Sequence, residues 1–175
     1  MRIPIESRTS YRGRNARPNW LALVAFIALG FAAGAVGVVF SPARSPASAA
    51  WYASLSKPAW IAPDRWFGPV WTVMYVLMGA AVWLVSRERY HTRLKAALTA
   101  YAVQLLLNAL WAPLFFGQKN VGAGLFDSVA LWLAVLWTLR EFFAVRPPAA
   151  LLLTPYLAWV SFAMAMNFSL WRLNL

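Results

Sequence analysis

Amide and aromatic side chains at helical spacing are the residues of this chain best suited to act on a ligand. Gln104, Asn108 and Trp111 follow one another at i, i+4 and i+7 inside an apolar stretch, so they share one face of a helix. An unpaired polar group in hydrocarbon costs several kcal/mol. These side chains therefore either bond a neighbouring helix or face a ligand, and the spacing leaves both interpretations open.

Two further apolar stretches carry aromatic rings along one helical face. Such a stripe packs more often in a core or against lipid than around a ligand. Three ring-bearing and amide-bearing faces in one small bundle nevertheless favour a pocket for a flat, apolar molecule. The two stripes consist of Trp71, Tyr75 and Met78, and of Tyr156, Trp159, Ala163 and Met166.

Metal chemistry and conventional acid–base catalysis have no obvious residues here. The chain has no cysteine and one histidine, which excludes disulfides, thiolate metal sites and cysteine nucleophiles. Zinc or protein-held haem iron would need a cluster of histidine, cysteine, methionine or carboxylate ligands, and no such cluster is visible. Nor is there a Ser-His-Asp set or a glycine-rich phosphate loop. We therefore expect no metal site, no required cofactor and no catalytic residue of these kinds.

Asp127 is the acidic residue expected inside an apolar stretch. A carboxylate within a membrane span is a functional candidate by default and needs a partner. It also lies about seven residues into its predicted helix, where the positive end of the helix dipole favours a negative charge. The sequence leaves the role of Asp127 undecided between the two.

Composition places these residues in a membrane protein. Apolar residues make up 62% of the chain and charged residues 12%, against about half and about a quarter in soluble domains. A helix of roughly 20 residues crosses a hydrocarbon core of about 30 Å. We predict an all-α membrane protein, a single bundle of five transmembrane helices with a long loop between the first two. The predicted segments are 19–40, 66–86, 96–118, 121–139 and 149–171.

The first segment follows an arginine-bearing stretch, residues 1–18, that is typical of a disordered basic tail beside anionic lipid. Its apolar run of about 20 residues exceeds the roughly 7–15 of a signal peptide, which favours a helix that is retained. The domain boundaries are then 1–18 for the tail and 19–175 for the transmembrane domain.

The net charge of +11 is explained by topology rather than by nucleic acid. Eleven of the sixteen Lys and Arg lie in the tail and in the loops 87–95 and 140–148, and five lie on the other side. The positive-inside rule then places the amino terminus in the cytoplasm and the long loop and carboxyl terminus outside it. The expected partner is a lipid bilayer, with no nucleic acid.

The long loop, residues 41–65, is predicted to be a lid. Four tryptophans and three prolines occur between positions 51 and 75, where this loop runs into the second segment. Tryptophan favours the membrane–water boundary and proline stiffens the backbone. The longest connection is also where a specialised function is expected.

The first segment contains Gly30-x-x-x-Gly34, and Ala33 with Gly37 repeats the small-residue spacing. Small residues let helices approach closely in lipid. Packing within the chain is the favoured interpretation, and a homodimer contact is the alternative.

Five sets of residues resemble the TspO/MBR family, the tryptophan-rich sensory proteins and translocator proteins. The resemblance covers most of the chain, from Trp20 to Asn174. It is carried by Trp51-Tyr52, by Lys57-Pro58-x-Trp60-x-x-Pro63, by Pro69-Val70-Trp71-Thr72-x-x-Tyr75 with Met78-Gly79, by Asn108-x-x-Trp111 with Phe115-Phe116, and by Pro155-Tyr156-Leu157-x-Trp159.

This resemblance implies a five-helix bundle whose first loop closes over a pocket for porphyrins, such as protoporphyrin IX or haem. It also implies which residues line that pocket: Trp51, Tyr52, Trp71, Tyr75, Asn108, Trp111, Trp159 and Ala163.

Two departures from the family pattern bear on the ligand. Many members have two prolines where this chain has Ala62-Pro63, so the lid is expected to be less stiff. The stretch Asn167-Phe168-Ser169-Leu170-Trp171-Arg172 lacks the tyrosine of the cholesterol motif proposed for animal members. A sterol or other lipid is therefore a weaker expectation than a porphyrin.

Three functions follow from these features. The first is a non-enzymatic sensor, regulator or carrier that binds a tetrapyrrole. The second is light-dependent porphyrin degradation, in which Trp71 and Trp159 would be the redox-active residues. The third is a membrane scaffold that acts through partner proteins and uses the face from Gly30 to Gly37.

Overall fold

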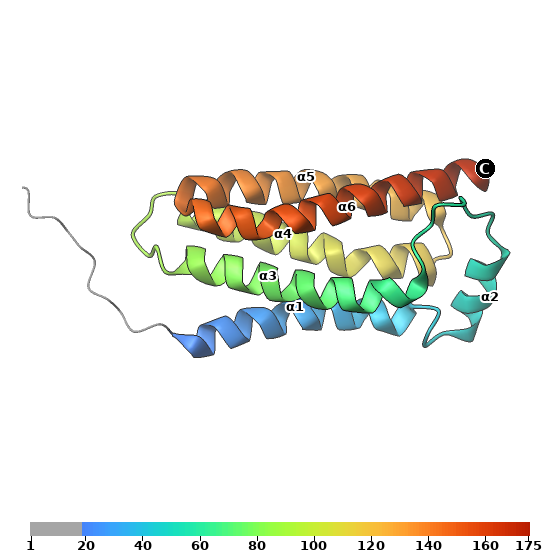
Figure 1. Cartoon of the computed structure of the whole chain (residues 1–175), viewed down its shortest axis with the longest axis horizontal. Coiled ribbons are helices and arrows are strands. Elements are labelled where there is room, and N and C mark those ends of the chain that lie inside the picture. The colour runs from blue at the N-terminus through green and yellow to red at the C-terminus, as the bar shows by residue number, and fades with distance from the viewer. Residues whose placement is uncertain (1–18) are drawn as a thin grey trace, which may run out of the picture.

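Five long helices and one short helix make up residues 19–175, the part of the chain that the computed structural model describes (Figure 1). No strand occurs in this part. The predicted tail, residues 1–18, lies outside the described residues. The elements in chain order are α1 (Trp20–Phe40), α2 (Pro46–Ser54), the 3₁₀ turn η1 (Asp64–Trp66), α3 (Phe67–Ser86), α4 (Leu94–Ala112), the π-helical turn η2 (Pro113–Gly117), α5 (Val121–Val145) and α6 (Pro147–Leu173).

The prediction of an all-α bundle with five membrane-spanning segments is confirmed. Five helices are long and apolar enough to cross a bilayer, and they correspond to the five predicted segments. Figure 1 shows them side by side, with α1 at one edge along α3, and α5 and α6 at the opposite edge. The short helix α2, the turn between η2 and α5 and the carboxyl end of α6 gather at one end of the bundle, which we call the lid end.

Local sequence signals explain where three of the helices begin. The side chains of Asn19, Ser45 and Asn120 each accept a hydrogen bond from the backbone N–H three residues later, at 3.2, 3.2 and 2.9 Å. Such N-caps satisfy one of the free N–H groups of a first helical turn. In α2 the cap is followed by Pro46 at the first helical position, where a missing N–H costs nothing.

Two helical regions differ from the prediction. The segment 41–65 is predicted as a long loop, and the structure adds the short helix α2 within it. The fourth span was expected to end at residue 139, but α5 continues to Val145, so that Arg146 alone separates it from α6. The extra turns carry Glu141, which is buried beside Arg93 of the loop before α4 at 3.4 Å. This pairing lets a charged residue continue the helix where composition suggested a loop.

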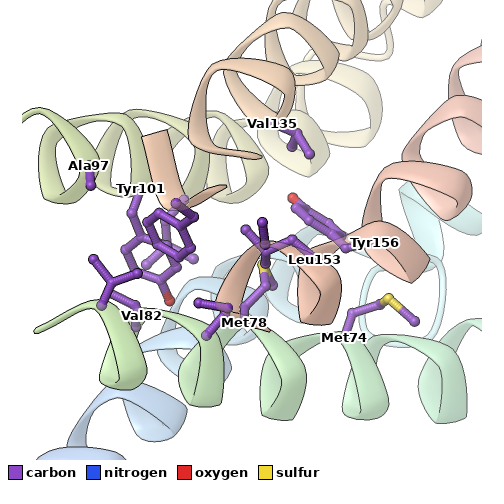
Figure 2. Packing of buried hydrophobic residues seen from close by; sticks show 14 of the residues in the cluster. Met74, Met78, Val82, Ala97, Tyr101, Val135, Leu153 and Tyr156 are labelled. Carbon is purple, nitrogen blue, oxygen red and sulfur yellow. The ribbon is translucent and has the colours of Figure 1, made fainter. Parts of the chain in front are cut away.

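The core of the bundle lies between α3, α4, α5 and α6. Figure 2 shows Met78 and Val82 of α3 meeting Tyr101 of α4 and Leu153 of α6. All four are buried, as is Tyr156 one turn further along α6. The aromatic stripe of α6 therefore belongs partly to the core, as its periodicity suggested.

Small residues bring α1 close to α3. A Cβ atom added at Gly34 would lie 2.5 Å from Cε2 of Tyr75, and one added at Gly79 would lie 2.8 Å from the backbone Cα and N of Ile27. Gly30 also packs against Tyr75. The Gly30–Gly34 pair thus serves packing within the chain, which was the favoured interpretation.

Candidate functional site

A cavity of about 930 Å³ lies at the lid end of the bundle. Its walls come from α1, α3, α4, η2, α5 and α6, and residues of the lid, including Tyr52 and Ile61, border it. Its volume is near the upper end of the range of about 300–1,000 Å³ that is typical of small-molecule sites. The structure brings seven of the eight predicted pocket residues into its lining: Tyr52, Trp71, Tyr75, Asn108, Trp111, Trp159 and Ala163.

Trp51, the eighth predicted residue, is not among the lining residues. Its ring packs edge-on against Phe115 at 5.3 Å and against Phe116 at 6.4 Å. Phe115 and Phe116 themselves line the cavity. Trp51 therefore packs against two residues of the aromatic wall and connects α2 to η2.

Aromatic rings form two walls of the cavity. Trp71 stacks on Tyr75 with ring centroids 5.4 Å apart, and Trp111 stacks on Phe115 at 4.8 Å. A stacked neighbour restricts how a ring can turn, so these walls are preorganised. Flat surfaces of this kind suit a flat, apolar guest.

Asn108 bonds two neighbouring helices and also borders the cavity. The Tyr75 hydroxyl donates to Asn108 Oδ1 at 3.2 Å, and Asn108 Nδ2 donates to the Tyr156 hydroxyl at 3.2 Å. The amide thus joins α3, α4 and α6, and it also borders the cavity. Gln104 differs, because it is buried against Met78 and does not line the cavity.

The predicted pocket residues do not include five polar residues of the lining, which are Ser41, Asp64, Thr72, Ser128 and Asn167. Ser128 and Asn167 border the cavity from α5 and α6. The Ser128 hydroxyl donates to the carbonyl of Gly124 at 2.8 Å, and Asn167 Nδ2 donates to Ser128 Oγ at 3.1 Å. The signal for them was a hydroxyl and an amide inside apolar helices, which is weak because a helical serine usually bonds its own backbone.

Asp127 is buried between the helices and is not among the lining residues. Within the described part of the chain, its Oδ2 atom has no hydrogen-bond partner. The same holds for Nε1 of Trp159 and Oδ1 of Asn167, which line the cavity, and for the Tyr101 hydroxyl and Oε1 of Gln104. In the same residues, no group of three His, Cys, Asp or Glu side chains is placed to bind a metal ion.

The lid places charged groups at the mouth of the cavity. Nζ of Lys57 lies 4.3 Å from the centre of the Tyr52 ring, and Asp64 lines the cavity nearby. Burial raises the pKa of Tyr52, and the negative charge of Asp64 raises it further. Tyr52 therefore stays neutral at physiological pH, with its ring available both to the cation and to the cavity.

Asn174 fastens the lid to the end of α6. Ser56 N donates to Asn174 Oδ1 at 2.9 Å, and Asn174 Nδ2 donates to the Ser56 carbonyl at 2.9 Å. Further along the lid, Ala62 N points at the Met166 sulfur at 3.4 Å. The backbone of the lid is thus bonded to two side chains of the end of α6 and its C-cap, the amide of Asn174 and the sulfur of Met166.

Replacing Asn174 with alanine is expected to loosen the lid without unfolding the bundle. Two hydrogen bonds of this kind contribute about 1–2 kcal/mol together, so hydrogen–deuterium exchange in residues 55–63 should become about 5- to 30-fold faster. Asn19→Ala, which removes an amide at the start of α1, is the matched control and should leave this segment unchanged. Equal exchange in wild-type and Asn174→Ala protein would contradict the proposed attachment.

Comparison with known proteins agrees with this arrangement. Residues 18–172 match the TspO/MBR family. The chain is 42% identical over 156 residues to the tryptophan-rich protein TspO of Chlorobaculum tepidum, covering 88% of this chain and 96% of that one. It is 41% identical to protein CrtK of Rhodobacter capsulatus, covering 81% and 86% of the two chains. It is also 41% identical to the human translocator protein, covering 71% and 75%.

The match extends over all five spans and over every residue that lines the cavity. The relatives are similar over most of their own length, so the likeness concerns the whole bundle rather than one motif. The chain therefore belongs to the TspO/MBR family and is a multi-pass membrane protein.

Proposed function

We propose that this protein binds a tetrapyrrole, such as protoporphyrin IX or haem, and acts as a sensor, regulator or carrier of it. The observation that carries the proposal is the aromatic cavity beneath the lid, with Trp71, Tyr75 and Trp111 in its walls. A porphyrin is flat, mostly apolar and wide, so it gains both from stacking and from removal of its surface from water.

Several polar groups of the cavity are already engaged within the protein, although Nε1 of Trp159 and Oδ1 of Asn167 have no partner among the described residues. Asn108 is engaged with two tyrosines, and Ser128 is engaged with Asn167 and the Gly124 carbonyl. A ligand that depended on many polar contacts would find few free partners among these residues. A ligand that is held by contact between rings needs few polar partners.

The experiment that tests this function is a titration of purified protein with protoporphyrin IX. Binding should shift the porphyrin absorbance and saturate at a fixed stoichiometry in detergent or nanodiscs. A linear, unsaturable signal equal to that of empty nanodiscs would refute specific binding.

The distribution of positive charge between the two ends of the bundle supports one orientation in the membrane. We infer that the amino terminus lies in the cytoplasm and the lid end outside it, because the end opposite the lid carries Arg146 and the three arginines of residues 87–93. Cysteine substitution at an exposed lid position such as Ser56, in this cysteine-free chain, gives a unique thiol. Labelling of intact cells by an impermeant maleimide would identify the side on which the lid lies.

A second candidate function is light-dependent breakdown of the bound porphyrin. It is favoured by the presence of Trp71 and Trp159 in the lining of the same cavity, where both rings can reach an excited guest. In air, illuminated wild-type protein should lose the porphyrin absorbance faster than Trp71→Phe, which keeps an aromatic wall but is harder to oxidise. Equal decay in the two proteins would remove this candidate and leave the binding function.

A further inference from the structure

The two ends of the bundle differ in whether their charged residues form ion pairs. At the end opposite the cavity, the acids are paired, Glu141 with Arg93 and Glu88 with Arg146. At the lid end, none of the cations lies within ion-pair distance of an acid among residues 19–175. These cations are Arg44, Lys57, Arg65, Lys119 and Arg172.

Three of these cations stand directly beside the cavity lining. Arg44 follows Ala43 in the chain, Arg65 follows Asp64, and Lys57 lies over the ring of Tyr52. Ala43, Asp64 and Tyr52 all line the cavity, whereas no lysine or arginine does. Positive charge is therefore concentrated at the mouth, above an apolar interior.

Lys57 is the best positioned of the three. The backbone of its neighbour Ser56 is fixed to Asn174 by two hydrogen bonds of 2.9 Å. Its Nζ rests 4.3 Å from the centre of the Tyr52 ring, which orients the ammonium group without neutralising it. The group is thus exposed at the mouth and ready to accept an anion.

We propose that Lys57 binds a carboxylate of the ligand, so that the ligand lies with its apolar rings in the cavity and its acidic group at the mouth. This inference rests on the proposed function and adds the class of ligand, an amphiphilic carboxylic acid, and its orientation. In protoporphyrin IX the carboxylates are the two propionates, which are ionised at neutral pH. Asp64, which also borders Tyr52, opposes this contact by repulsion.

The test compares protoporphyrin IX with its dimethyl ester, which has the same rings and no charge. Lys57→Gln should weaken binding of the free acid by about two- to fivefold, as for other solvent-exposed ion pairs. Asp64→Asn should strengthen it by a similar factor. Neither change should alter binding of the ester, and high salt should reduce both effects on the acid.

Arg89→Gln is the matched control, because it removes one exposed positive charge from the opposite end of the bundle. If Arg89→Gln weakens binding of the free acid as much as Lys57→Gln does, the net charge of the protein rather than Lys57 is responsible and the inference is wrong. An acid-to-ester affinity ratio that is the same in wild-type, Lys57→Gln and Asp64→Asn protein also overturns it, while the proposed function stands. Failure of both porphyrins to bind wild-type protein overturns the proposed function together with this inference.

Discussion

Replacing Trp71 with alanine is expected to weaken protoporphyrin IX binding by about 10- to 100-fold. The indole borders the cavity and stacks on Tyr75, so the substitution removes ring contact with the guest and leaves the tyrosine unsupported. A stacked aromatic pair contributes about 0.5–1.5 kcal/mol beyond the apolar area that it buries. With the area included, the loss is about 1.4–2.7 kcal/mol, which corresponds to this range of affinity.

Trp159→Ala should act in the same direction, because Trp159 lines the cavity from α6. The measurement is a porphyrin titration followed by porphyrin absorbance, since the change in tryptophan number alters any fluorescence amplitude. Trp137→Ala is the control, because Trp137 is 39% exposed on α5 and is not among the lining residues. The assignment of the pocket would be refuted if the titration curves of Trp71→Ala and Trp159→Ala both coincided with the wild-type curve.

Replacing Gly79 with alanine should destabilise the bundle more than any change at the cavity. The new Cβ would lie 2.8 Å from the backbone Cα and N of Ile27, and a backbone cannot turn away as a side chain can. Helix α1 would have to move away from α3, which we expect to cost about 3 kcal/mol. The melting temperature should fall by about 10 °C.

Gly68→Ala provides a matched control at the start of the same helix. A Cβ at Gly68 meets no atom within 4 Å. Because alanine is a better helix former than glycine, this variant should melt at or slightly above the wild-type temperature. If Gly79→Ala has the same melting temperature as Gly68→Ala, the close contact between α1 and α3 does not stabilise the protein.

The five spans could be predicted because length and apolar content dominate the folding of a chain in lipid. The ends of the spans were less predictable. Arg140 and Glu141 indicated a loop by composition, but Glu141 is buried beside Arg93, a partner 48 positions away. A pairing at that separation leaves no local signal in the sequence.

Helix α2 was missed for a different reason. The tryptophans and prolines of the lid indicate a stiff loop and give no sign of a helix. The start signal was nevertheless present, since Ser45 caps the helix and Pro46 occupies its first position. Local capping chemistry would have predicted α2 where hydropathy could not.

At the candidate site, helical spacing predicts which side chains share a helix face but not which of them reach the cavity. Met78, Gln104 and Tyr156 share faces with lining residues and are buried in the core instead. The spacing of Asn108 is compatible with a bond to a neighbouring helix or with facing a ligand; the side chain bonds Tyr75 and Tyr156 and also borders the cavity.

Trp51 is predicted in the lining but packs edge-on against Phe115 and Phe116 and is not among the lining residues, because the way α2 docks on η2 decides where its ring points. The Lys57 contact with Tyr52 likewise depends on how the lid folds back on itself.

Tyr75 connects the cavity to the outermost helix. Its ring stacks on Trp71 beside the cavity, its hydroxyl bonds to Asn108 of α4, and its other side fills the hollow left by Gly30 and Gly34 of α1. A guest that pushed Tyr75 toward α1 would press on this helix, because the ring already fills the space at Gly30 and Gly34. If α1 shifted in response, a second molecule that binds the shifted helix would raise the affinity for the guest, and the guest would raise the affinity for that molecule by the same factor. The small residues that let two helices touch would then link the interior of the bundle to the surface of α1.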